Sequence, residues 1–180
     1  MGDMGCFKNG INKDAADFGH GYPFVNLLDV FGVSKLSADR QKFGLVNSSK
    51  EERLTYDLKS GDILFVRSSV KPEGVGLTTL VQDDLPETVF SGFLLRYRGN
   101  GELVNKFKEH CFFQERFRRN LIANSTVSAN TNINQEVLKK LYICFPPDKD
   151  KQTAIATILS DMDVTCLDFS HHGALEMGLS

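Results

Sequence analysis

The sequence predicts an α/β (α+β) fold, in which short strands and a packing helix form one domain and a further helix follows at the C-terminal end. A chain of 180 residues is long enough to bury one hydrophobic core. Its 41% hydrophobic and 24% charged residues are typical of globular domains, so we do not expect a disordered, collagen-like or coiled-coil chain. Short apolar runs bounded by turn residues alternate with stretches in which apolar residues recur at helical spacing.

The apolar runs in the first part of the chain predict the strands of the sheet. The strand at 22–28 is entered through a Gly-Tyr-Pro turn, and residues 63–66 lie between a Ser-Gly-Asp turn and a polar triplet. Residues 75–81 and 87–98 are the next two predicted strands. One face of the last strand is expected to consist of Val89, Phe93, Leu95 and Tyr97. The polar stretch at 36–52 predicts a long loop.

Helical spacing of apolar residues predicts the two longer helices. Residues 103–121 carry an apolar stripe and are expected to form the main packing helix. A Ser-, Thr- and Asn-rich loop is expected at 125–134, followed by a short helix at 135–140 and a strand at 141–145 that ends at two prolines. The spacing is helical again at 150–163 and is lost in the stretch that begins at Val164.

Charge is distributed unevenly along a chain whose net charge is -2. From Asp148 to the end there are six acidic residues and two lysines, so this stretch carries -4 and residues 1–147 carry +2. These values give no strongly basic footprint, although a basic stripe can still lie on one face.

The cysteines and the lengths of the apolar runs indicate the compartment. Cys6, Cys111, Cys144 and Cys166 are widely spaced and form no CxxC pair, so we expect buried free thiols rather than a zinc site or disulfides. The apolar runs are far shorter than the roughly 18 residues of a membrane helix, and the N-terminus has no apolar signal core. The sequence therefore predicts a soluble, cytoplasmic chain with no membrane contact.

Most enzyme motifs are missing from the sequence. There is no GxxxxGK[ST] loop and no Asn-Pro-Pro-Tyr element of an adenine methyltransferase, so we expect no catalytic residue, no cofactor and no metal site. One alternative is a small Mg²⁺-dependent nuclease, because Asp57 and Lys59 have D-x-K spacing and Asp62 follows closely. A solvated loop is the competing interpretation of these charges.

Two polar segments carry side chains of the types that contact DNA. Arg67, Ser68, Ser69 and Lys71 directly follow the predicted strand at 63–66, so a rigid element is expected to hold them at a surface. The loop at 125–134 offers hydroxyl and amide groups to phosphates from Ser125, Thr126, Ser128, Asn130, Thr131 and Asn132. The competing interpretations are a solvated turn for the first segment, and a helix cap with a hydrogen-bonded loop for the second.

Three sequence blocks follow one another over about 160 residues. The first is GCFKNGINK at 5–13 with GYPFV at 21–25, and the second is LKSGDILF at 58–65 with RSS at 67–69. The third block comprises Ser125-Thr126, Asn132-Ile133, residues 141–147 and QTAIA at 152–156. In this order and spacing, the blocks resemble the target-recognition domain of the specificity subunit of type I restriction–modification enzymes.

That resemblance implies an irregular, curved and mostly antiparallel sheet that contacts the DNA major groove. It implies a non-catalytic, sequence-specific recognition module for double-stranded DNA, which directs an adenine methyltransferase (M) subunit and a restriction (R) subunit. Residues 1–148 are then the recognition domain, and residues 149–180 are a truncated spacer or dimerisation helix and its tail. The chain departs from the family in having one recognition domain instead of two, Lys151 in place of a glutamate, and a helix that ends early. A truncated interaction remnant that no longer binds DNA is therefore a further alternative.

The predicted C-terminal helix has an apolar face formed by Ile155, Ile158, Leu159 and Met162. One interpretation is that this face packs on its own domain. The resemblance instead implies that the helix projects from the domain, and a projecting helix of about 14 residues is marginal alone in water. We therefore expect the face to be buried between chains, by a second copy in a homodimer or by a partner subunit.

Overall fold

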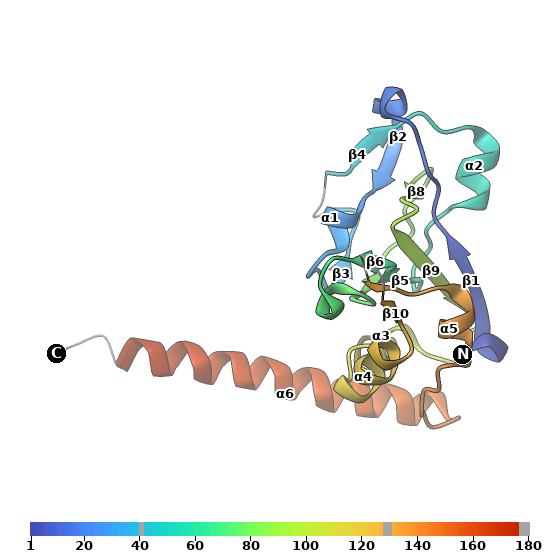
Figure 1. Ribbon diagram of the computed structural model, residues 1–180. Helices are drawn as coiled ribbons and strands as arrows, with labels where there is room; N and C mark the ends of the chain where they lie inside the picture. The colour runs from blue at the N-terminus through green and yellow to red at the C-terminus, as the bar shows by residue number, and fades with distance from the viewer. Residues whose placement is uncertain (40–41, 128–130, 177–180) are drawn as a thin grey trace.

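The computed structural model describes residues 1–39, 42–127 and 131–176, with Val127 and residues 163–176 described by their backbone only. Within these residues the strands form three small sheets, and a long helix, α6 (Lys149–Glu176), runs along the base of the domain (Figure 1). The C-terminal part of α6 projects beyond the rest of the domain (Figure 1). The predicted α/β domain with a C-terminal helix is thus confirmed.

The largest sheet has the strand order β1-β9-β5-β7-β3. Its strands are β1 (Gly5–Asn9), β9 (Leu94–Gly99), β5 (Ile63–Val66), β7 (Thr78–Val81) and β3 (Lys35–Leu36). Neighbouring strands are antiparallel, except that β3 and β7 are parallel. Strand β5 confirms the prediction at 63–66, and β7 confirms a shorter form of the prediction at 75–81.

Side chains alternate across this sheet and enter two separate cores. On one side they pack with α3 (Asn105–Cys111) and α4 (Glu115–Ala123); the sheet residues in this core include Ile63, Phe65, Leu95 and Tyr97. On the other side Leu64 and Val66 pack with residues that include Val30 of α1 (Leu27–Val30). Because both faces are covered, all four residues of β5 are buried.

The two smaller sheets complete the domain. Strands β4 (Gly44–Val46), β2 (Phe18–Val25) and β8 (Val89–Phe90) form one sheet, and β2 and β4 lie at the end of the domain opposite α6 (Figure 1). Strands β10 (Thr126–Val127), β11 (Thr131–Asn132) and β6 (Ser68–Ser69) form the other sheet, which is antiparallel throughout. Strand pairing in the described residues is therefore mostly antiparallel.

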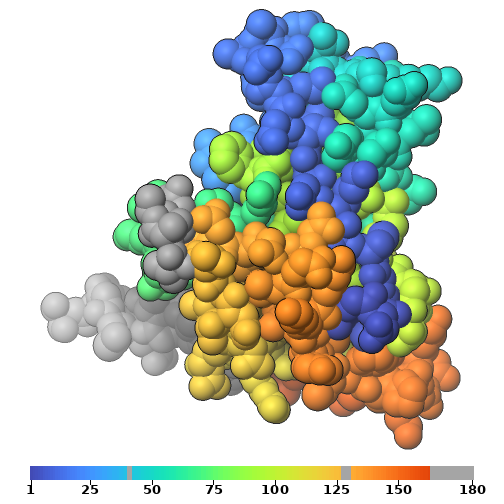
Figure 2. All heavy atoms as spheres, turned by 45° about the vertical axis from the view of Figure 1, so that its right-hand side comes forward, coloured from blue at the N-terminus to red at the C-terminus, as the bar shows by residue number. Residues whose placement is uncertain are grey.

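The remaining helical elements are short. They are α2 (Lys50–Thr55), α5 (Gln135–Lys140) and the 3-10 turns η1 (Gly2–Met4), η2 (Ala15–Asp17) and η3 (Pro72–Gly74). Helix α5 confirms the short helix predicted at 135–140. It packs against β1 and η1, and Figure 2 shows this segment in orange beside the dark blue N-terminal residues.

The single packing helix predicted at 103–121 is wrong, because the chain breaks between α3 and α4. Gln114 has an extended backbone, with ψ 137°, and precedes the first residue of α4. The ring of Phe112 is fully buried between the two helices, and its centroid lies 5.8, 5.8 and 5.5 Å from those of Phe65, Tyr97 and Phe117. The break lets Phe112 enter this aromatic cluster while α3 and α4 both contribute to the same core.

A turn at Ser91-Gly92-Phe93 divides the strand predicted at 87–98 into β8 and β9. A side chain on Gly92 would clash with Asn12, so this turn lies close to the chain segment that contains Asn12. Phe93 does not share a buried face with Leu95 and Tyr97, because it lies on the turn and is 58% exposed. That part of the prediction is wrong.

Three other predicted segments differ from the structure. The loop predicted at 36–52 contains β4 and the start of α2, which begins at a capping box formed by Ser49 and Glu52. The strand predicted at 22–28 begins at Phe18 and ends at Val25, where Asn26 caps α1. The strand predicted at 141–145 does not form. This segment connects α5 to α6 and pairs with none of the described sheets.

The first turns of α6 are attached to the domain along one edge. The side-chain amide of Gln152 is completely buried: it donates to the carbonyls of Glu102 and Pro146 and accepts from the amide of Val104. One turn later Ala156 is also buried. The helix continues to Glu176, so the predicted loss of helix after 163 is wrong. No helix in the described part of the chain is long and apolar enough to cross a membrane.

This attachment divides the apolar face that was predicted for α6. Ile155, Ile158 and Met162 are 39%, 59% and 58% exposed. Leu159 is instead half-buried and lines a hollow with Phe113. Three of the four predicted residues therefore point away from the domain, and Leu159 does not lie with them.

The described cysteines are free thiols, but the prediction that they are buried holds only for Cys111. Burial raises the pKa of Cys111 to about 12. Cys6 is exposed because it alternates on β1 with the buried Phe7, and Cys144 is exposed in the segment before α6. The side chain of Cys166 lies outside the described residues.

Candidate nucleic-acid interface

The β10-β11-β6 sheet brings together the two polar segments that lie far apart in the sequence. Ser68 pairs with Asn132, and Ser69 pairs with Thr131. Thr126 pairs with Asn132 from the other side. The stretch predicted as a loop at 125–134 thus contains two paired strands, and main-chain pairing fixes its polar side chains relative to those of β6.

Arg67 connects this small sheet to the central one. Its main-chain amide donates to the carbonyl of Phe93 over 2.8 Å, and its carbonyl accepts from the amide of Ile133 over 2.9 Å. Its guanidinium Nη1 donates to the carbonyl of Gly92 over 3.3 Å. Since Ile133 is buried in the core, both Arg67 and β11 are anchored to the interior of the domain.

Helix α4 supports the segment that follows β6. The amide of Lys71 donates to Oγ of Ser69 over 3.3 Å, and η3 follows directly. Nη2 of Arg118 on α4 donates to the carbonyls of Glu73 and Val75 over 2.7 and 3.3 Å. The exposed Lys71 therefore lies on a loop whose backbone is fixed on both sides.

The predicted residues of the second segment differ in their surroundings. The hydroxyl of Ser125 donates to the carbonyl of Ile122 over 2.6 Å and so satisfies the C-terminal end of α4. Thr126 is exposed, Asn132 is half-buried and Thr131 is buried. Ser128 and Asn130 lie outside the described residues.

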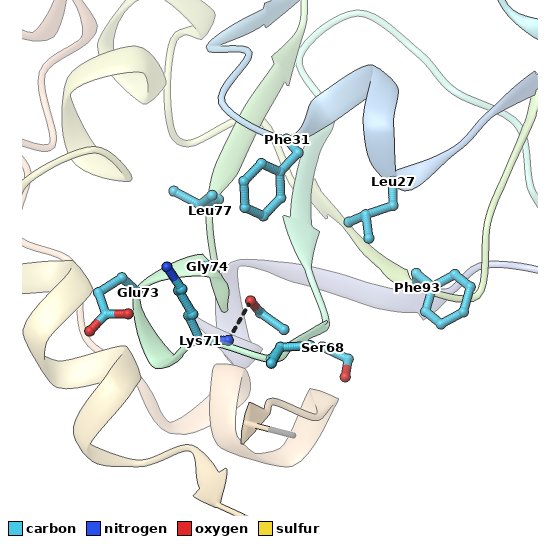
Figure 3. A pocket seen from close by; sticks show the side chains of 10 residues that line it. Leu27, Phe31, Ser68, Lys71, Glu73, Gly74, Leu77 and Phe93 are labelled. Atoms are coloured by element: carbon cyan, nitrogen blue, oxygen red, sulfur yellow. Dashed lines mark hydrogen bonds between the residues drawn. The ribbon is translucent and has the colours of Figure 1, made fainter. Parts of the chain in front are cut away.

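An apolar groove of about 580 Å³ opens beside the polar residues of β6 (Figure 3). Its apolar lining residues are Leu27, Phe31, Val70, Leu77 and Phe93, and its other lining residues are Ser68, Ser69, Lys71, Glu73 and Gly74 along β6 and η3. Phe31 and Phe93 are 47% and 58% exposed. This groove was not predicted from the sequence, although Ser91-Gly92 is a turn signal that marks Phe93 as a turn residue.

The carboxylates of the nuclease alternative are bound to arginines. Arg98 donates from Nε and Nη2 to Asp62 over 2.8 and 2.6 Å. Nη1 of Arg96 and Nη1 of Arg98 donate to Oδ1 of Asp57 over 2.8 and 3.1 Å. Among the described residues, no group of three or more His, Cys, Asp or Glu side chains is arranged to hold a metal ion. The geometry therefore gives no support to a Mg²⁺-dependent nuclease.

Opposing effects act on the pKa of Asp57. Burial alone would raise this pKa, but the charges and hydrogen bonds of Arg98 and Arg96 outweigh burial and hold it below its ordinary value. The hydrogen bond to Asp62 raises the pKa of Arg98. Both groups are charged at neutral pH and bind each other, which is the arrangement of a structural ion-pair network.

One protein family matches nearly the whole chain. The family model described as type I restriction modification DNA specificity domain matches residues 2–176. A search of curated protein sequences gave no match.

Three similar solved structures share the fold. A chain from a structural study of complex assembly and conformational transition in the type I R-M system has a TM-score of 0.68 and 15% identity, covering 97% of this chain and 40% of that one. The HsdS subunit from Thermoanaerobacter tengcongensis has a TM-score of 0.63 and 17% identity, covering 95% and 38%. The S subunit from M. genitalium has a TM-score of 0.57 and 15% identity, covering 94% and 39%. This chain thus spans about two fifths of the length of each of these chains.

Proposed function

The chain belongs to the family of type I restriction modification DNA specificity domains, and we propose that it is a sequence-specific recognition module for double-stranded DNA. Residues 1–148 form the recognition domain in this proposal, and residues 149–180 form a spacer or dimerisation helix and its tail. The proposed DNA contacts are Arg67, Ser68, Ser69, Lys71, Ser125, Thr126 and Asn132, together with Asn130, which lies outside the described residues.

The observation that carries the proposal is the β10-β11-β6 sheet. It collects serine, threonine and asparagine side chains next to Arg67, and these are the types that pair with base edges and phosphates. Their main chains are hydrogen-bonded to one another and, through Ile133, to the core. Such fixed positions favour base reading over an ordinary solvated turn.

The proposed module has no catalysis of its own and acts in the cytoplasm by directing M and R subunits. Support comes from Asp57 and Asp62, because arginines already occupy the carboxylates that a nuclease would need for Mg²⁺. The family match supports the partner subunits, because its description names a DNA specificity domain of a restriction–modification system.

Binding measurements with random duplexes test the proposed function. The whole chain is expected to select a preferred sequence from a pool of random duplexes. With roughly four phosphates neutralised, the logarithm of the binding constant should fall with the logarithm of salt concentration at a slope of about -3.6. The proposal is contradicted if the bound duplexes show no sequence preference, or if the binding constant does not change with salt concentration.

A second copy of the chain is the proposed partner of α6. Ile155, Ile158 and Met162 point away from the domain and are exposed, so they can pack against the same residues of another copy. Two copies paired through α6 would carry two recognition domains in one assembly.

Sedimentation of matched variants tests this pairing. We expect a dimeric wild type and a monomeric Ile158→Asp variant, because a carboxylate buried in the interface is costly. At protein concentrations low enough to dissociate the wild-type dimer, the melting temperatures should agree, because Ile158 is 59% exposed in the single chain. Leu54→Asp is the control, since Leu54 is 70% exposed on α2, and this variant should remain dimeric. A monomeric wild type contradicts the pairing.

A further inference from the structure

The groove beside β6 carries an exposed aromatic ring on a backbone with little freedom. The amide of Gly92 donates to the carbonyl of Ile11 over 2.7 Å, and the amide of Leu94 donates to the carbonyl of Ser91 over 2.9 Å. The amide of Phe93 itself donates to Oγ of the buried Ser91 over 3.3 Å. The turn is therefore fixed on both sides of Phe93, and its 58% exposed ring is held at the surface.

The opposite side of the groove is fixed as well. Gly74 passes so close to Ser69 that a side chain at this position would clash with the Ser69 hydroxyl. Strand β6 is paired with β11, and Arg118 holds the carbonyl of Glu73. An apolar side and a hydrogen-bonding side thus face one space, and both are built on anchored backbone (Figure 3).

Arg67 links this groove to the proposed DNA contacts. Its main-chain amide and its guanidinium donate to the carbonyls of Phe93 and Gly92, respectively. The ring and the guanidinium are therefore attached to the same turn. A duplex that contacts Arg67 would therefore bring a neighbouring base near Phe93.

We propose that Phe93 is a specificity-determining residue that contacts the 5-methyl group of a thymine in the major groove, a role that rests on the proposed DNA recognition. The thymine methyl is the apolar feature of the major-groove edge, and phenylalanine is among the side chains that contact it. Ser68 and Ser69 line the same groove and offer hydroxyls to polar atoms of the adjacent bases. Lys71 and Arg67 supply positive charge beside the groove, which also contains the carboxylate of Glu73. These hydroxyls and cations fit a duplex better than they fit an apolar protein surface.

Replacing thymine by uracil tests this contact, because uracil lacks only the 5-methyl group. The probes are duplexes of the sequence that the whole chain selects from a random pool, with uracil at one thymine position at a time. At one position or more, uracil should weaken wild-type binding about fourfold, the factor expected when one methyl group is no longer buried. Phe93→Ala should bind the thymine and uracil duplexes equally, and Phe93→Leu should keep the preference for thymine.

A second ring supplies the matched control. Phe113 is 37% exposed and lines a different hollow beside α6, so Phe113→Ala should keep the thymine preference. The proposal is overturned if the wild type never prefers thymine, or if the selected sequence contains no thymine. It is also overturned if Phe93→Ala lowers the affinity for the thymine duplex and for the uracil duplex by the same factor, so that the thymine preference is kept. That result would indicate a wedge between base pairs. Failure to select any sequence refutes the proposed function itself, whereas a selected sequence without thymine preference refutes only the role of Phe93.

Discussion

Charged and polar side chains flank β5 at both ends, but those at one end bind within the fold and those at the other end lie towards the surface. Before the strand, Asp62 is 1% exposed, and both of its oxygens accept hydrogen bonds from Arg98. After the strand, the guanidinium of Arg67 meets a main-chain carbonyl, and the half-buried serines and exposed Lys71 follow it. Charges at the first end are paired within the fold, while the second end presents donors to the surface. Residue type alone therefore does not identify a binding site, because the partner of each charge decides its role.

Breaking the ion pair at the first end should give the largest effect. Asp62→Ala leaves Arg98 without its Asp62 partner and removes the acceptor of the Lys59 amide. We expect a loss of about 3–5 kcal/mol in the free energy of unfolding, as for other broken buried pairs. Urea denaturation measures this loss. Lys59→Ala is the control, because the Lys59 side chain is 61% exposed and its pair with Asp57 should contribute less than about 1 kcal/mol. Equal stability of Asp62→Ala and wild type would remove the contrast between the two ends.

The opposite result is expected at the second end. Arg67→Ala should cost about 1–3 kcal/mol of binding free energy on the selected duplex and should relax the preference at one base pair, because a bidentate arginine–guanine contact has this value. Its free energy of unfolding should change by less than that of Asp62→Ala, since Arg67 makes one side-chain hydrogen bond to a carbonyl. Fluorescence anisotropy gives the affinity, and parallel urea denaturation gives the stability. If Arg67→Ala lost stability but kept its affinity for the duplex, Arg67 would be a structural residue and not a DNA contact.

Stability should also depend on pH through the first end. Folding lowers the pKa of Asp57 below the ordinary value of 3.8, so this residue contributes its full stabilisation above that value. The contribution is lost as the pH falls through 3.8 towards the folded pKa. Asp57→Asn should therefore be less stable than wild type at neutral pH and should lose less stability on acidification between about pH 5 and pH 3. Parallel curves of urea midpoint against pH would show that Asp57 does not carry this dependence.

The smallest effect is expected from the exposed charge at the second end. Lys71→Ala should reduce the slope of affinity against salt by about one, with similar weakening on all duplexes, because a phosphate contact carries no sequence information. Lys50→Ala on α2 is a suitable control for an exposed lysine outside the proposed interface. Titrations at several salt concentrations distinguish the two variants. An unchanged slope in Lys71→Ala would exclude a phosphate contact by this lysine.

The sequence predicted the elements whose signals are local. Strand β5 was predictable, because four apolar residues lie between a Gly-Asp turn and a polar triplet. The break between α3 and α4 was not, because the apolar spacing continues across it and its cause is packing of Phe112 on Phe65 of another element. Phe112 and Phe65 are far apart in the sequence, so no local pattern predicts this contact.

The candidate site was predictable by residue type but not by arrangement. Arg67 and Asn132 belong to polar segments of the expected composition. Strands β6 and β11 have two residues each, so they are too short to show the alternating pattern that predicts a strand. Phe93 was assigned to a strand because its neighbours alternate in the pattern of a strand, and the fixed turn depends on contacts with Ile11.

Mechanically, the distal part of α6 is a lever arm that begins where the contacts of the helix with the domain end. Gln152 holds the first turn, and α3 holds the next two turns, since Nζ of Lys106 donates to Oγ1 of Thr157 over 3.1 Å and Nε2 of His110 lies 3.3 Å from Oγ of Ser160. From Ser160 to Glu176 the helix rises about 24 Å, at 1.5 Å per residue. A tilt of about 5° at Ser160 therefore displaces the far end by about 2 Å. The alignment of anything carried on the distal part of α6 thus depends on how firmly its first turns are held against Gln152 and α3.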